Sequence, residues 1–309
     1  MKKESRWVFI INPVAGNGFA GKFASEIEEI IRLFNLTAEV IFTEKKGHAI
    51  QLTRHAINQG VDYIIAVGGD GTFNEVIQNL VNRSDITFGA IPAGTGNDFI
   101  NILGFSERFT TNDWEIFFQR NTIQMDVGKC NNRYFINGMG LGFDAQVAFE
   151  NYESENSENV KGGGKNKYWW HIIKTLVTYK EKDMQLSINE TTKRSKSFLN
   201  TIANGRRLAG GFYLTPDAIA NDGLLTVCMI EQLKFFGRIK ALLRVIKQKH
   251  TQDDVVNYFT TNQISFQFDE IVPAHLDGEL LFDSKFTVSI FPASLKVIYN
   301  PNGNHYFQS

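Results

Sequence analysis

The chain has 309 residues, 43% of them hydrophobic, which is enough for two domains because a single hydrophobic core seldom serves more than about 250–300 residues. Its 32 Lys and Arg residues nearly cancel its 33 Asp and Glu residues, so the whole molecule lacks the positive field that attracts a nucleic acid or an anionic membrane. We therefore expect no nucleic-acid partner, and we expect any membrane contact to be local.

The sequence fits a cytoplasmic protein. Its two cysteines, Cys130 and Cys228, lie far apart without a metal or redox spacing, as is common in a reducing compartment. The apolar run 8–11 is too short for a signal peptide, and no run approaches the roughly 20 apolar residues of a transmembrane helix. Residues 305–309 resemble the remnant of a protease cleavage site, and we expect no function from them.

The first third of the chain alternates short β-branched or aromatic runs with amphipathic stretches. The predicted strands are 7–11, 38–42, 63–67 and 87–91, and the predicted helices between them are 21–34, 49–59 and 72–81. This alternation predicts an α/β domain with a helix-covered parallel sheet. We place this domain at residues 1–125.

From about Asp126 the pattern changes to short alternating runs separated by Gly, Asn and Asp. The predicted strands are 133–137, 185–188, 198–203, 224–230 and 263–268, interrupted by predicted helices at 168–179 and 235–246. They predict a β-sandwich domain over residues 126–289, with a mobile polar stretch at 152–167. The strand-like segment 294–299 can close either domain, so residues 290–303 can pack back on the first.

Two weak motifs follow the first predicted strand. Residues 16–21 match the G-x-G-x-x-G dinucleotide fingerprint, and Glu44 lies where a ribose-binding acid would be expected. Residues 16–22 also match a P-loop, but Phe23 replaces the Ser or Thr that would bind magnesium. Because Asn12 and Pro13 separate the strand from the glycines, we disfavour a nicotinamide site; the alternative is a glycine-rich turn into a helix.

A more specific motif is the run 67–75, Val-Gly-Gly-Asp-Gly-Thr-Phe-Asn-Glu, between a buried strand and a helix. Glycines allow close approach of a phosphate, and the helix N-terminus offers unpaired N–H groups. The alternative is a tight turn in which Asp70 and Thr72 cap the helix. Residues 91–99, Ile-Pro-Ala-Gly-Thr-Gly-Asn-Asp-Phe, repeat this chemistry after the next strand, so both turns are expected at one edge of the sheet.

These blocks resemble a known family. Asn-Pro-x-Ala-Gly at 12–16, the run 68–75 and Pro-x-Gly-Thr-x-Asn-Asp-Phe at 92–99 are similar to the diacylglycerol kinase catalytic family, whose relatives include sphingosine, ceramide and bacterial lipid kinases. Further similar blocks lie at 137–144, 210–211, 216–224 and 276–279. The resemblance implies a nucleotide-binding α/β domain similar to phosphofructokinase and NAD kinase, a β-sandwich lipid domain, and an active site between them.

The resemblance also implies roles for individual residues. ATP would be held by Asn12, Pro13, Val14, Ala15, Gly16, Thr43, Gly68, Gly69, Asp70, Gly71, Thr72, Phe73, Asn74 and Thr95. Asp70 and Asp98 would lie near Mg²⁺, and Glu279 would take the proton from the lipid hydroxyl. Ile219, Asp222 and Leu224 match an additional magnesium site, although Asn-Asp-Gly at 221–223 is also a hairpin signal, so this site can be structural.

The expected activity is that of an ATP-dependent lipid kinase, with diacylglycerol as the first candidate substrate. An NAD kinase-like phosphotransferase and a non-enzymatic nucleotide- or lipid-binding module are the alternatives. The stretch 168–177, rich in aromatic residues and flanked by lysines, predicts a peripheral membrane contact, with core packing as the other interpretation. A homodimer is an option that the sequence leaves open.

Overall fold

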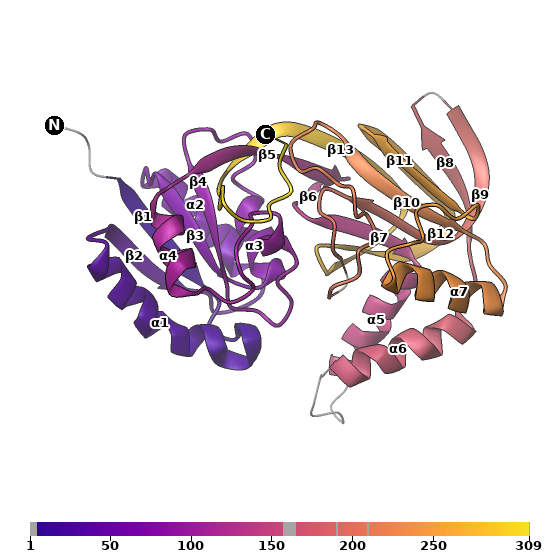
Figure 1. Ribbon diagram of the computed structural model, residues 1–309, viewed down its shortest axis with the longest axis horizontal. Coiled ribbons are helices and arrows are strands. Elements are labelled where there is room, and N and C mark those ends of the chain that lie inside the picture. Colours follow the sequence, from indigo (N-terminus) through magenta and orange to yellow (C-terminus); the bar gives the residue numbers. More distant parts are fainter. Residues whose placement is uncertain (1–4, 157–164, 190, 209, 309) are drawn as a thin grey trace. The chain divides into compact units, whose positions relative to one another are not determined.

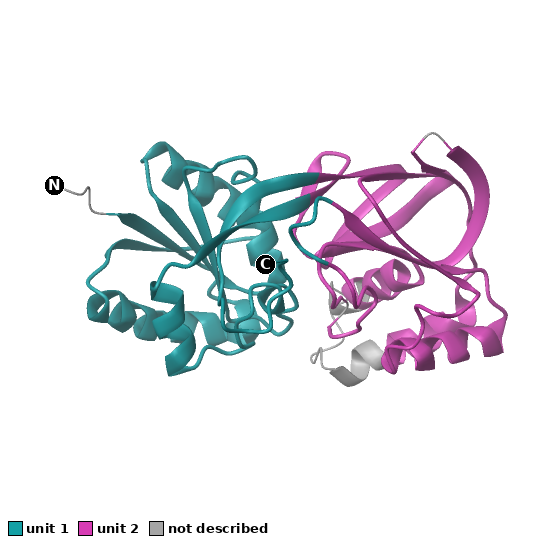
Figure 2. Ribbon diagram, turned by 45° about the horizontal axis from the view of Figure 1, so that its top comes forward, with its two compact units in different colours: residues 1–127, 219–223, 291–309 teal, residues 128–218, 224–290 magenta. Residues whose placement is uncertain are grey.

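The computed structural model describes residues 5–156, 165–189, 191–208 and 210–308 (Figure 1). The chain divides into two compact units (Figure 2). The first contains Met1–Val127, Ile219–Gly223 and Phe291–Ser309, and the second contains Gly128–Ala218 and Leu224–Ile290. The sequence placed residues 219–223 in the second domain, whereas the structure places them in the first.

The helices and strands follow in chain order. Those of the first unit are β1 (Arg6–Ile11), α1 (Ala15–Leu33), β2 (Thr37–Phe42), α2 (His48–Asn58), β3 (Tyr63–Gly68), α3 (Asp70–Ile77), β4 (Thr87–Pro92), the 3-10 turn η1 (Phe99–Asn101) and α4 (Thr111–Phe118). Those of the second are β6 (Arg133–Phe135), β7 (Gly138–Gly142), α5 (Phe143–Asn156), α6 (Lys165–Thr178), β8 (Asp183–Ile188), β9 (Thr191–Ala203), β10 (Leu225–Glu231), α7 (Phe235–Ile246), β11 (Val256–Thr261) and β12 (Gln263–Leu276). Two strands, β5 (Thr122–Cys130) and β13 (Glu279–Ile298), contain residues of both units.

The sheet of the first unit has the strand order β2-β1-β3-β4, and every neighbouring pair is parallel. The end of β13 adds a further parallel strand beside β4, with Val297 opposite Phe88. Strands β3 and β4 are buried along almost their whole length, as expected for apolar runs covered by helices on both faces. The loops that follow these parallel strands therefore gather at one edge of the sheet.

Several helix boundaries differ from those predicted. Helix α1 begins at Ala15, but residues 16–18 have positive φ angles of 60°, 58° and 85°, so its regular part follows a glycine-rich turn. Helix α4 was missed, although Thr110 and Asp113 form a capping box at its start. The stretch 152–167, expected to be mobile, contains the end of α5 and the start of α6, and its residues 157–164 lie outside the described residues.

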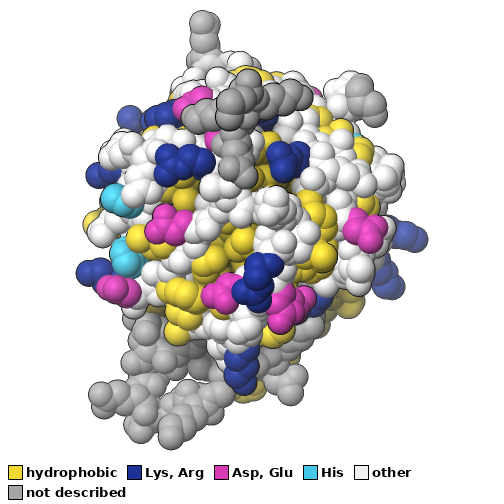
Figure 3. All heavy atoms as spheres, turned by 90° about the vertical axis from the view of Figure 1, so that its left-hand side faces the viewer, with side chains coloured by type: hydrophobic (Ala, Val, Ile, Leu, Met, Phe, Trp, Pro, Cys, Tyr) yellow, Lys and Arg dark blue, Asp and Glu magenta, His cyan; other side chains and the backbone are white. Residues whose placement is uncertain are grey.

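The surface of the molecule mixes charges of both signs. On the face drawn in Figure 3, Lys and Arg side chains lie among Asp and Glu side chains, with hydrophobic areas between them. This distribution agrees with the near-zero net charge of −1 and gives that face no extended positive area.

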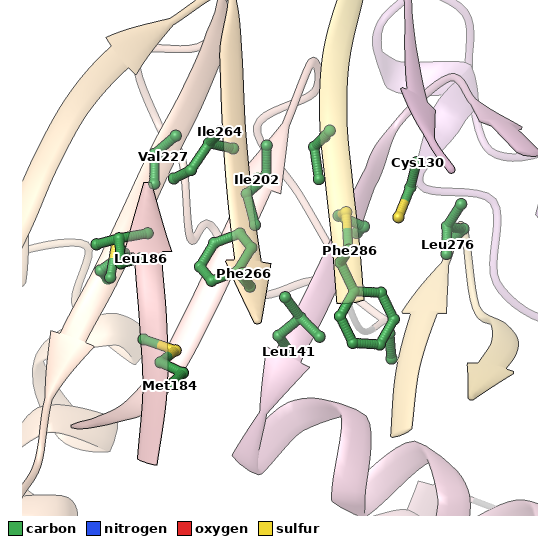
Figure 4. Close-up of a cluster of buried hydrophobic side chains, with 14 of the residues drawn as sticks. Cys130, Leu141, Met184, Leu186, Ile202, Val227, Ile264, Phe266, Leu276 and Phe286 are labelled. Atoms are coloured by element: carbon green, nitrogen blue, oxygen red, sulfur yellow. The ribbon is translucent and has the colours of Figure 1, made fainter. Parts of the chain in front are cut away.

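The second unit is built on antiparallel strands. Strand β9 pairs with β8 along its first half and with β7 and β10 along its second half. Strand β12 likewise pairs with β8 and then with β7, and it also pairs with β13. Figure 4 shows the buried side chains that these strands enclose, among them Leu141, Ile202, Phe266 and Phe286. The alternating runs of the sequence thus form a sheet with one buried apolar face.

Helices α5, α6 and α7 pack against another part of this sheet. Their buried side chains include Val147, Ile172 and Val245, which contact Phe198 and Ile230 of the strands. Helix α5 was not predicted, whereas α7 has the predicted bounds and α6 begins three residues before the predicted helix at 168. Among the described residues, no helix is long and apolar enough to cross a membrane.

Candidate active site

Three loops meet at the carboxyl edge of the parallel sheet. They follow β1, β3 and β4, and backbone hydrogen bonds join them. The N–H group of Asn12 donates to the carbonyl of Val67 at 3.0 Å, and the N–H groups of Ala93 and Gly94 both donate to the carbonyl of Gly68, at 2.7 and 3.0 Å. The two glycine-rich turns that the sequence placed at one edge are therefore bonded to each other.

Close backbone contact explains several glycines in these loops. A Cβ atom on Gly94 would overlap the Cα atom of Gly69, and a Cβ atom on Gly16 would overlap the carbonyl oxygen of Ala93. Gly16 also has a φ of +60°, which side chains rarely allow. These glycines are required for the loops to pack together, in addition to any approach of a phosphate.

Asp70 fixes the loop that follows β4. Its carboxylate accepts the N–H groups of Asp98 at 3.0 Å and Phe99 at 3.1 Å, one on each oxygen. Asp70 therefore caps η1. Its own helix α3 has the glycine Gly69 as its N-cap residue, so no side chain caps that helix. A carboxylate oxygen can accept more than one bond, so these two contacts do not by themselves exclude Asp70 from binding a cation.

Asn12 connects the first loop to α3. Its Nδ2 donates to the hydroxyl of Thr72 at 3.1 Å, while its Oδ1 accepts the N–H group of Val14 at 3.3 Å. The N–H group of Thr43, after β2, donates to the carbonyl of Ile11 at 2.8 Å. The predicted nucleotide-binding residues follow four separate strands, and the fold thus brings them to the same edge of the parallel sheet.

The predicted nucleotide residues differ in how far their side chains are accessible. Thr72, Phe73 and Asn74 are buried, and the ring of Phe73 lies 5.9 Å from that of Phe99 in the core. Only their backbone could reach a ligand. Val14 and Thr95, in contrast, are exposed and can present their side chains.

Glu75 is a residue whose role sequence reasoning missed. Its carboxylate accepts the N–H groups of Gly47 at 2.7 Å and Ala49 at 3.2 Å, at the start of α2. It therefore ties α3, which begins at Asp70, to the loop that follows Thr43. The signal was present, because Glu75 ends the glycine-aspartate motif, but only the fold shows which helix it caps.

Glu279 belongs to the second unit and begins β13. The preceding Asp277 and Gly278 have φ angles of 48° and 86° between paired strands, as in a type I′ hairpin turn. The carboxylate of Asp277 accepts the N–H groups of Ile136, Asn137 and Gly138, each at 2.9 Å. Residues 277–278 therefore form a hairpin turn, and the half-buried Glu279 follows this turn directly.

The segment around Asp222 is held by a buried carboxylate. Asp126 accepts the N–H groups of Gly223 at 2.6 Å and Ala293 at 2.7 Å. Burial raises the pKa of Asp126 above its usual value, and the negative charge of Asp222 raises it further. Carboxylates are oxygen donors of the kind that Mg²⁺ prefers, and the segment that contains Asp222 is held in place by Asp126.

The hairpin predicted at residues 221–223 is wrong. Among residues 204–208 and 210–224, the structure describes only an isolated bridge between Leu208 and Phe212, and no strand precedes the turn. The segment is a loop leading into β10. Across the described chain, no group of three or more Asp, Glu, His or Cys side chains could hold a metal ion, so a bound magnesium would need other oxygen ligands.

The C-terminal residues pack on the same segment. The N–H group of Ala220 donates to the carbonyl of Tyr306 at 2.9 Å, and the N–H group of Gln308 donates to Oδ1 of Asn221 at 2.7 Å. Tyr306 and Phe307 are buried. These residues, from which the sequence predicted no function, thus have a structural part in the first unit.

The second unit contains an apolar cavity beneath α5, α6 and α7. Its lining includes Phe143, Phe198, Phe212 and Leu214, together with the carboxylate-bearing Asp144, and its empty space is about 510 Å³ including the part open to solvent. The Oδ2 atom of Asp144 lies 3.3 Å from Nε2 of His275, and both side chains are buried. The sequence marked Asp144 only as the end of a block, and it gave His275 no role.

Glycine-rich loops at the edge of a parallel α/β sheet, followed by an antiparallel β unit, make a two-unit protein whose sheet edge is of the kind that binds nucleotide phosphates. The chain belongs to the diacylglycerol kinase catalytic-domain family: residues 6–130 match the family described as diacylglycerol kinase catalytic domain. Residues 136–299 match the YegS C-terminal NAD kinase beta sandwich-like domain. The expected family and the expected β-sandwich character of the second domain are both confirmed.

Individual relatives agree with this assignment. A protein named "Probable lipid kinase YegS-like" from Chromohalobacter salexigens is 28% identical over 82% of this chain and 81% of its own. A diacylglycerol kinase from Staphylococcus saprophyticus is 27% identical over 90% of each chain. The crystal structure of a diacylglycerol kinase from Bacillus anthracis superposes with a TM-score of 0.77 over 97% of this chain and 99% of its own, at 22% identity, which indicates a shared fold.

Proposed function

We propose that the protein is an ATP-dependent lipid kinase that transfers the γ-phosphate of ATP to a lipid hydroxyl, with diacylglycerol as the first candidate substrate and phosphatidic acid as the product. The observation that carries this proposal is the meeting of the three loops after β1, β3 and β4, with Asp70 between the second and the third. Backbone N–H groups and glycines at such an edge suit nucleotide phosphates.

In this proposal each loop has a separate task. Residues 12–16 and Thr43 bind the nucleotide, while the start of α3 and the exposed Thr95 bind its phosphates. Asp70 and Asp98 would hold Mg²⁺, and Asp222 with the carbonyls of Ile219 and Leu224 would hold a second ion. Bound Mg²⁺ supplies positive charge that offsets the charge of the phosphates.

Catalysis then depends on position and on one proton transfer. Glu279 takes the proton of the lipid hydroxyl as its oxygen attacks the γ-phosphate, and ADP leaves on the opposite side. The three bonds that Asp277 accepts support this role, because they hold the turn that comes directly before Glu279. No covalent enzyme intermediate is required.

The apolar cavity of the second unit supports a lipid acceptor. An acyl chain requires a site lined by apolar and aromatic side chains, and the lining of this cavity is almost entirely of that kind. We further propose a cytoplasmic enzyme that binds membranes peripherally, in keeping with the near-neutral charge of the chain.

A second candidate is an NAD kinase-like phosphotransferase. It is favoured by the description of the matched C-terminal family as an NAD kinase beta sandwich-like domain. In that case the acceptor would be a polar nucleotide, which the apolar cavity does not suit. A non-enzymatic binding module is disfavoured because Asp70, Asp98 and Glu279 are all present.

Acceptor choice separates these candidates. We expect ADP release from ATP and Mg²⁺ to be stimulated by diacylglycerol in mixed micelles, and not by NAD or by micelles without a lipid alcohol. Stimulation by NAD alone would establish the second candidate. ATP binding without ADP release for any of a panel of diacylglycerol, phosphatidylglycerol, sphingoid bases and polyprenols would instead support the binding module.

A further inference from the structure

Helix α7 exposes large apolar side chains on the side that faces away from the sheet. Phe236 is 83% exposed, Leu243 is 51% exposed and Ile246 is 48% exposed. The opposite side of the helix is buried, with Ala241 and Val245 packed toward the strands. A helix that buries one apolar side in the protein seldom carries a second apolar side in water, so this one calls for an explanation.

The charged residues of α7 and of its flanking residues are all basic. Residues 232–249 contain six Lys and Arg residues and no Asp or Glu. The two arginines have internal partners, because Arg238 pairs with Glu181 at 2.8 Å and Arg244 pairs with Asp253. The four lysines are exposed and lie in or beside the helix, at positions 234, 240, 247 and 249.

Helix α6 lies beside α7 and continues its apolar surface. Nη1 of Arg238, in α7, donates to the carbonyl of Leu176, in α6, at 2.9 Å. On α6 the exposed apolar residues are Trp170, Ile173 and Val177, whose spacing puts them on one side of the helix. The buried side chains of both helices, Ile172 and Leu176 of α6 with Ala241 and Val245 of α7, belong to one core cluster against the strands. The exposed sides of both helices therefore lie away from that cluster.

We name this surface the α6–α7 face and define it by Trp170, Ile173, Val177, Phe236, Leu243 and Ile246. We propose that the α6–α7 face docks on the surface of an anionic phospholipid bilayer, with α7 as the main contact. Apolar side chains would enter the interface, and the four lysines would approach the lipid phosphates. The sequence assigned a membrane contact to residues 168–177; the side chains of Tyr168 and Trp169 lie outside the described residues, and α7 was not considered.

The proposal rests on the proposed function and adds to it the place at which the lipid arrives. Ile172 of α6 and both Leu242 and Val245 of α7 line the apolar cavity from the inner side of the same two helices. A bilayer bound to their outer side would therefore supply lipid next to the cavity. An anionic surface is preferred to a second copy of the chain, because a copy would bring the same lysines against each other.

Vesicle binding tests the proposal with the full chain. Vesicles of phosphatidylcholine, with and without phosphatidylglycerol, are sedimented with the protein in the absence of ATP and diacylglycerol. The apolar variant is Phe236→Ser with Leu243→Ser, and its control is Ile271→Ser, an equally exposed apolar residue on β12. The charge variant is Lys240→Glu with Lys247→Glu, and its control is Lys193→Glu, on β9.

We expect wild type to prefer the anionic vesicles and each double variant to bind them more weakly, by on the order of 10-fold or more, with added salt weakening wild type as well. Both controls should bind as wild type does. Melting temperatures should be unchanged, since the altered side chains are exposed; if the apolar variant unfolds, the charge variant still decides the question.

Wild-type binding by both double variants, or failure of wild type to bind either vesicle, would overturn the proposal. The proposal would also be overturned if sedimentation showed that wild type is a dimer and the apolar variant a monomer. The α6–α7 face would then be a subunit interface. Turnover of a water-soluble short-chain diacylglycerol is measured in parallel. Vesicle binding through this face without any turnover would reject the proposed function and leave the docking surface standing.

Discussion

At the scale of single residues, Asp70 has a structural task beside its proposed chemical one. Asp70→Asn replaces one accepting oxygen by an NH₂ group that faces a backbone N–H, so one partly buried bond is lost. Such a loss costs about 1–3 kcal/mol, and we expect the melting temperature to fall by several degrees as well as turnover to fall to near zero.

Thermal unfolding and a turnover assay check this prediction. The matched control is Asp85→Asn, which alters an exposed pair with Arg83 and should leave both quantities close to wild type. If Asp70→Asn had full activity and a lowered melting temperature, the role of Asp70 would be structural capping alone.

Glu279 is predicted to act in the proton transfer alone. Glu279→Gln should leave ATP affinity near wild type and lower the maximal rate by about 100-fold to 10,000-fold, the usual range for a general base. Glu270→Gln, a change at an exposed carboxylate that pairs with Lys182, serves as the control. Weakened ATP binding in Glu279→Gln would assign the residue to the nucleotide or metal instead.

At the scale of secondary structure, Glu75 of α3 bonds to the start of α2. It thereby links the glycine-rich turn before α3 to the loop that follows Thr43. Glu75→Ala removes two N–H contacts at the start of α2, which should cost about 0.5–2 kcal/mol of stability. We expect the KM for ATP to rise several-fold while kcat changes little. Glu29→Ala, at an exposed position of α1, is the control. An unchanged KM in Glu75→Ala would show that α2 plays no part in nucleotide binding.

The sequence predicted the four parallel strands of the first unit well, because each is a compact apolar run between turn residues. The sequence offered the return of residues 290–303 to the first domain as one of two options, because a strand-like run alone does not show which sheet it joins. The structure places residues 291–309 in the first unit, with Val297 beside β4. The loop at residues 221–223 was mistaken for a hairpin for a similar reason. Its conformation depends on Asp126, which lies 97 positions from Gly223 in the sequence.

The same distinction holds for the candidate site. The glycines and Asp70 were identified because their residue types in that spacing indicate a phosphate loop. Glu75, Asp126 and the Asp144–His275 pair were not, because the groups that they contact come from distant parts of the chain. Sequence spacing finds a residue that acts within its own loop, and it misses one that acts across the fold.

At the scale of the whole molecule, the two units carry different parts of the proposed chemistry. The first holds the three loops, Asp70, Asp98 and Asp222, and the second holds Glu279 and the apolar cavity. Three segments of the chain build the first unit, which includes the C-terminal residues that pack on the Asp222 loop. The proposed activity therefore requires the full chain rather than its first 127 residues.

The most direct test of the central claim follows the transferred phosphate itself. The protein is incubated with Mg²⁺, diacylglycerol in mixed micelles and ATP whose γ-phosphate carries heavy oxygen, and the lipids are analysed by mass. The account predicts phosphatidic acid that carries the labelled phosphoryl group, formed by wild type and not by Asp70→Asn. Labelled phosphate found only as free inorganic phosphate, with no phosphorylated lipid from any alcohol offered, would contradict it.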